Sequence, residues 1–195
     1  MFEKTMFILV FAFAVPAQAA DTTGTWAIQD VQVANRVQFS LQVTGGGKGT
    51  FQSSSEFDMS QVEGLTMARM ASPSGTIVRF DIMREAGTFI CEGYFKAGNG
   101  AGTFIFKPSP SFVLQMATLG FSDVAEDMLF SMAVHDIGMR YAAEIQAMGL
   151  KVPTASKLIA MKIHGVTPGY VRKMQARWPE ITLDQLISLR IHGID

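Results

Sequence analysis

The spacing of apolar residues changes once along the chain and divides it into two parts. Over residues 21–108 apolar and polar side chains alternate, as Val37 and Phe39 do with the polar residues beside them. Such alternation is typical of strands with one buried and one solvated face. It predicts strands near 24–33, 36–43, 48–56, 77–84, 88–96 and 101–107. A short helical turn is expected over 59–62, and glycine-rich links such as 45–49 favour hairpins between the strands. The predicted arrangement is an antiparallel β-meander, folded as a small sandwich or a partial barrel.

From residue 109 the apolar positions follow a longer period, and the chain repeats itself. Two residue types mark the repeat at intervals of 28 or 29, namely the aromatic residues Phe112, Tyr141 and Tyr170 and the histidines His135, His164 and His192. A leucine stands six residues before each histidine, and a small residue stands four before it. An internal period of this length is typical of helical hairpins stacked on one another. It predicts three units, near 110–135, 139–164 and 168–192.

Residues that favour helix ends stand at matching places in these units. Proline suits the first turn of a helix, threonine the N-cap and glycine the C-terminal stop. The residues concerned are Pro110, Pro168, Thr154, Thr182 with its capping-box partner Gln185, Gly165 and Gly193. The predicted fold class is therefore α+β, with an antiparallel β-domain over 20–108 followed by helical hairpin repeats over 109–195.

The N-terminal segment has the pattern of an export signal. A short apolar run, Met6 to Val15, precedes Ala17-Gln18-Ala19, and small residues at these positions suit a signal peptidase. Residues 1–19 are therefore expected to be removed, leaving a mature chain that begins near Ala20. The run is too short to span a membrane, and no apolar segment of spanning length follows it. The predicted localisation is periplasmic or secreted, without a transmembrane segment in the mature chain.

Composition narrows the range of functions. With 16 Lys+Arg against 17 Asp+Glu the net charge is −1, which offers no electrostatic footprint for nucleic acid. The single cysteine, Cys91, excludes an intrachain disulfide, and its alternation with Phe89 and Phe95 predicts a buried, inert thiol. No nucleophile elbow or phosphate-binding loop is found, so neither catalytic residues nor a cofactor are expected.

The histidines and the methionines each suggest a metal site, and each set also has a structural explanation. Stacked repeats hold equivalent histidines at least about 10 Å apart. A zinc ion binds histidine nitrogens that each lie about 2 Å from the metal, so these histidines are too far apart to share one ion. Each histidine is instead expected to end a helix, where an imidazole suits the last carbonyls. The 13 methionines suggest Cu(I), but several of them fall on the apolar face of the repeats and fill a core. No metal site is predicted.

Part of the repeat resembles a known family. Ile163–Val171, with the sequence IHGVTPGYV, and Leu186–Gly193, with the sequence LISLRIHG, resemble the "RIHGVTPEYV" helical repeats. These repeats occur in exported parts of bacterial membrane metallopeptidases of the beta-lactam-sensor type and in related stand-alone secreted proteins. The segments 91–96, 100–104 and 130–136 resemble the strand module that precedes them. The resemblance implies an exported module without proteolytic activity, because the chain contains no His-Glu-x-x-His pair. Gly169 stands where the repeat usually has Glu.

Two functional hypotheses follow. The leading one is a non-enzymatic interaction or scaffold module that binds a protein partner or an envelope component. Its candidate contact residues are Arg172, Lys173, Arg177 and Trp178, since arginine and tryptophan are favoured at interfaces. A solvated helix face, with Trp178 closing the loop onto the next hairpin, would explain the same cluster. The second hypothesis is a small-ligand carrier with a pocket inside the β-domain, lined by Trp26, Phe39 and Phe80.

Overall fold

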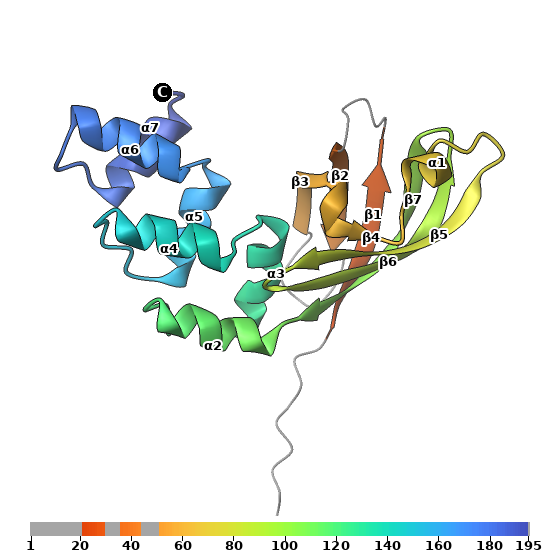
Figure 1. Ribbon diagram of the computed structural model, residues 1–195, viewed down its shortest axis with the longest axis horizontal. Helices are drawn as coiled ribbons and strands as arrows, with labels where there is room; N and C mark the ends of the chain where they lie inside the picture. The colour runs from red at the N-terminus through yellow and green to blue at the C-terminus, as the bar shows by residue number, and fades with distance from the viewer. Residues whose placement is uncertain (1–20, 30–35, 44–50, 195) are drawn as a thin grey trace, which may run out of the picture.

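The computed structural model describes residues 21–29, 36–43 and 51–194. The predicted signal peptide and the predicted hairpin at 45–49 lie outside the described residues. Within the described ranges the fold is α+β, with one antiparallel sheet and seven α-helices (Figure 1). The last strand ends at Pro108 and the next helix begins at Pro110.

Seven strands form the sheet, in the order β3-β2-β1-β7-β6-β5-β4. They are β1 Thr22–Ile28, β2 Arg36–Val43, β3 Phe51–Asp58, β4 Val62–Glu63, β5 Thr76–Arg84, β6 Gly87–Lys96 and β7 Asn99–Pro108. Each of the six predicted strands has a counterpart, although 30–33 of the first and 48–50 of the third lie outside the described residues, and the two-residue β4 was missed. The first strand pairs with β2 on one side and with β7 on the other. The two ends of the strand region therefore meet in the middle of the sheet.

The helices from α2 onward lie within the limits of the three predicted units, whereas α1 was not predicted. They are α1 Met67–Met70, α2 Pro110–Thr118, α3 Glu126–Val134, α4 Met139–Ala147, α5 Ala155–Ile163, α6 Pro168–Arg177 and α7 Leu183–Ile191, and the predicted helical turn is a 3-10 helix, η1 Met59–Gln61. The predicted caps are confirmed. Thr154 and Thr182 accept hydrogen bonds from the backbone N–H three residues later, and Gln185 completes the capping box. Gly165 and Gly193 have φ of 70° and 69°, a left-handed conformation that glycine adopts without strain.

A pair of glycines makes room for the largest side chain of the sheet. Gly93 of β6 faces Gly102 of β7, and a Cβ on Gly93 would lie 2.6 Å from the Trp26 ring. The indole N–H therefore comes close enough to donate to two backbone carbonyls, those of Glu92 (3.2 Å) and Thr103 (3.0 Å). Trp26 is thus fixed both by burial and by hydrogen bonds to β6 and β7.

Sheet and helices share one hydrophobic core. The helix α3 packs against β6 and β7, as Figure 1 shows. Its Phe130 ring lies 5.9 Å from Phe89 and 5.4 Å from Phe106, measured between ring centroids. Such aromatic contacts add to the free energy of burial, so α3 attaches the helices firmly to the sheet.

A charged contact also spans this junction at the end of β5. Arg84 Nη1 lies 3.2 Å from Asp136 Oδ1 in the α3–α4 link, and the guanidinium carbon lies 4.5 Å from the centroid of the Phe57 ring. The Arg84 side chain is only 3% exposed. The next residue, Glu85, accepts a hydrogen bond of 3.0 Å from the backbone N–H of Met139, at the start of α4. The β5–β6 hairpin therefore holds the link between α3 and α4.

Candidate protein-binding groove

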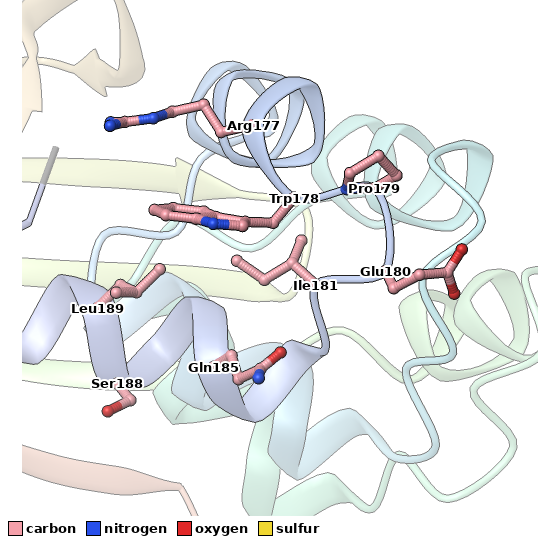
Figure 2. A pocket seen from close by; sticks show the side chains of 8 residues that line it. All are labelled: Arg177, Trp178, Pro179, Glu180, Ile181, Gln185, Ser188 and Leu189. Carbon is pink, nitrogen blue, oxygen red and sulfur yellow. The ribbon is translucent and has the colours of Figure 1, made fainter.

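The four predicted contact residues lie on one helix and its C-terminal end. Arg172 and Lys173 are exposed in the middle of α6, Arg177 is its last residue, and Trp178 is its C-cap. The structure brings Arg177 and Trp178 to one surface groove (Figure 2). Arg172 and Lys173 are not among the residues that line this groove.

The groove lies between the end of α6, the link that follows, and α7. Its volume is about 530 Å³, and its lining residues are Arg177, Trp178, Pro179, Glu180, Ile181, Gln185, Ser188 and Leu189. Figure 2 shows the Trp178 ring between the Arg177 side chain on one side and Ile181 and Leu189 on the other. The Arg177 guanidinium carbon lies 5.0 Å from the centroid of the Trp178 ring, a cation–π distance.

The link after α6, in which Trp178 lies, is shorter than the links after α2 and α4. The helices α2 and α4 are each followed by a left-handed glycine, Gly120 (φ 89°) and Gly149 (φ 72°). After α6 the chain reads Arg177-Trp178-Pro179, with no glycine. The backbone N–H of Trp178 bonds directly to the Met174 carbonyl, and 44% of its surface remains exposed. Sequence reasoning found Arg177 and Trp178 from their residue types, and it missed the other lining residues, Pro179, Glu180, Ile181, Gln185, Ser188 and Leu189.

The residues proposed for a ligand pocket lie together inside the sheet. The Trp26 ring centroid is 5.7 Å from that of Phe39 and 5.1 Å from that of Phe80, and Phe39 and Phe80 are 6.2 Å apart. All three are at most 2% exposed. Rings at these distances are in contact, so they fill the space between them. The three residues act as core.

The histidines occupy equivalent helix ends. His135, His164 and His192 are the C-cap residues of α3, α5 and α7. The capping hydrogen bond that the sequence assigned to the imidazole is made by the backbone N–H instead. Burial, and next the positive charge of Lys162, lower the pKa of His135. Within the described residues no group of three or more His, Cys, Asp and Glu side chains is placed to hold a metal ion.

Cys91 is buried in the sheet, as predicted. Its side chain faces the core between β5 and β7, where Phe80 and Phe104 are its cross-strand neighbours. Burial first, and the nearby charge of Asp81 second, raise the pKa of the thiol well above its ordinary value. The thiolate is the reactive form, so the native protein holds Cys91 inert.

Comparison of the chain with protein-family models, curated proteins and solved structures finds no match. Among the helices of the described residues, none combines the length and the apolar character needed to cross a membrane.

Proposed function

We propose that this chain is an exported, non-enzymatic module, periplasmic or secreted, that binds a protein partner or an envelope component through the groove between α6 and α7. The observation that carries the proposal is the half-exposed Trp178, stacked on Arg177 beside Ile181 and Leu189. The export pattern of residues 1–19 and the resemblance to the "RIHGVTPEYV" repeats support the same assignment.

The chemistry of the groove suits a protein surface better than a small polar substrate. Tryptophan and arginine are the residues most enriched among those that dominate interface energies, and they act best beside a fully desolvated apolar pocket. Trp178 and Leu189 supply the apolar surface, while Arg177 and Glu180 place charges at its rim. A partner that covers the indole would remove its large apolar surface from water, which is the main favourable term in association.

The groove also lies on the outer face of the last described pair of helices. We propose that α2–α3, α4–α5 and α6–α7 are three repeat units stacked in order. Three helix contacts support this arrangement, those of α2 with α4, α4 with α6, and α3 with α5. A face of a repeat unit that nothing covers is normally polar. An apolar groove at that place indicates a surface that is covered when the module functions.

Site-directed photocrosslinking tests this function in the native envelope. A photoreactive phenylalanine analogue at position 178 should yield a discrete adduct with one partner. The same analogue at Ile77, which is 80% exposed on β5, serves as the control and should yield none. Leu189→Asp should abolish the adduct, whereas Ile191→Asp, on the same helix but outside the groove lining, should preserve it. Equal adducts from positions 178 and 77, or none from position 178, would refute a partner-binding groove.

A further inference from the structure

Resting on the proposed function, we infer that the occupant of the groove is a helical hairpin of another protein, docked where a fourth repeat unit would stack. Its first helix would carry an aromatic residue, an aliphatic residue four positions later, and a glutamine immediately after that. The inference comes from what covers the equivalent surfaces of the first two units.

A glutamine joins each unit to the one before it. Gln146 of α4 donates a 3.1 Å hydrogen bond to the carbonyl of Leu119, at the end of α2. Gln175 of α6 donates a 3.1 Å hydrogen bond to the carbonyl of Met148, at the end of α4. Each acceptor lies seven residues after the marker aromatic residue of its unit, and the same count from Tyr170 reaches Arg177. Arg177 lines the groove, so its carbonyl is the equivalent acceptor for an incoming glutamine.

The helices that bring these glutamines share one pattern. Tyr141, Ile145 and Gln146 in α4 match Tyr170, Met174 and Gln175 in α6. The aromatic and aliphatic residues of both helices are buried. A helix that covers the third unit in the same way would therefore need the same three residue types at the same spacing.

Two apolar positions show that the third unit lacks this cover. The residue fourteen positions before the histidine is Phe121 in the first unit, Leu150 in the second and Trp178 in the third. Their side chains are 1%, 8% and 44% exposed, respectively. Three residues before it stand Met132 and Met161, both fully buried, and Leu189, which is only partly buried and lines the groove. The surface left open at the third unit is thus the surface that is closed in the first two.

An acidic residue favours a hairpin over a single helix. Asp123 stands twelve residues before the histidine of the first unit. Its carboxylate accepts hydrogen bonds of 2.9 and 3.1 Å from the backbone N–H of Ala155. Ala155 begins α5, which is the second helix of the following unit. The middle unit has Val152 at this position, but the third has Glu180, which lines the groove. Glu180 therefore offers a carboxylate to the N-terminus of a second docked helix, where negative charge is favourable.

A second copy of this chain fits less well than a different protein. Three described helices carry an aromatic residue with an aliphatic residue four positions later at the repeat positions, namely α2, α4 and α6. All six of these side chains are already buried within the chain, at 8% exposure or less. A copy could present them to the groove only by opening its own core.

The test uses the purified chain and a synthetic peptide of residues 138–165, with one hydrocarbon staple in each helix. This peptide carries the required pattern and should shift the fluorescence of Trp178, while Trp26 is buried and unaffected. Peptide variants Tyr141→Ala and Ile145→Ala should lose binding. Gln146→Ala should weaken it about 3- to 10-fold, the effect of one lost hydrogen bond.

Substitutions in the protein distinguish binding of a hairpin from binding of a single helix. Glu180→Ala should weaken binding of the hairpin peptide but leave a single-helix peptide, residues 138–149, unchanged. Ile191→Ala is the control and should alter neither. Equal binding of both peptides, with no effect of Glu180→Ala, would overturn the hairpin. Concentration-dependent dimers lost on Trp178→Ala would show that a second copy is the occupant. Photocrosslinks at position 178 that the hairpin peptide fails to displace would overturn this inference while leaving the proposed function intact.

Discussion

Replacing Arg84 by methionine is expected to stabilise the protein. Arg84 is the last residue of β5 and its side chain is 3% exposed. Its Nε and Nη1 are buried and have no hydrogen-bond partner. Burial lowers the pKa of the guanidinium, and the charge of Asp136 only partly opposes that effect. These two nitrogens therefore lose hydration on folding without gaining a hydrogen bond, although Nη1 keeps its ion-pair contact with Asp136.

The size of the effect follows from these contacts. A buried donor without a partner costs about 1–3 kcal/mol. The ion pair with Asp136 offsets little of this, because the Asp136 side chain is 57% exposed and such solvated pairs contribute about 0–1 kcal/mol. Methionine keeps an unbranched stem, and its sulfur suits the face of Phe57 that the guanidinium now covers. We expect Arg84→Met to increase the free energy of unfolding by about 1 kcal/mol, or about 2–4 °C in Tm.

A double-mutant cycle with Asp136→Asn provides the matched comparison. Asn tolerates the left-handed backbone of Asp136 (φ 52°), so this change removes charge with little strain. Asp136→Asn alone should destabilise the protein by up to about 1 kcal/mol, and it should have a smaller effect in the Arg84→Met background, where the attraction between Asp136 and Lys162 remains. Urea unfolding followed by circular dichroism measures all four proteins. A loss of more than about 1 kcal/mol on Arg84→Met would refute the reasoning, because it would mean that the guanidinium is satisfied in the folded protein.

Three further predictions concern other residues. Cys91 should react with a thiol reagent only after denaturation, because burial raises its pKa, and rapid labelling of the native protein would contradict its place in the core. His135 has a pKa lowered by burial from its ordinary value of 6.5, so the unfolded chain takes up the proton first as the pH falls. The free energy of unfolding should accordingly fall as the pH drops through 6.5, and His135→Gln should reduce this pH dependence. Urea unfolding midpoints measured across this pH range test it. The same pH dependence in wild type and His135→Gln would contradict the argument. Mass spectrometry of the native protein should find an N-terminus near Ala20, and an intact Met1 would exclude cleavage after Ala19.

Local patterns in the sequence were sufficient to predict most elements. Alternation identified six strands because a strand with one buried face must place apolar residues at every second position. Proline, threonine and glycine located helix ends because each satisfies or avoids backbone groups within a few residues of itself. The burial of Cys91 followed in the same way, from its neighbours on one strand. These properties depend on interactions within one element, so the sequence is enough to determine them.

The pairing of β1 with β7 and the groove at Trp178 were decided by the tertiary structure. Trp26 donates to carbonyls 66 and 77 residues away, and no short-range pattern specifies such partners. Leu189 occupies the same repeat position as Met132 and Met161, so its pattern alone predicts burial. It lines an open groove because exposure depends on whether another element covers a position, and this face of α7 is left partly open in the described residues. Sequence determines which surface of a helix is apolar, whereas the arrangement of the whole chain determines which apolar surface is left for a partner.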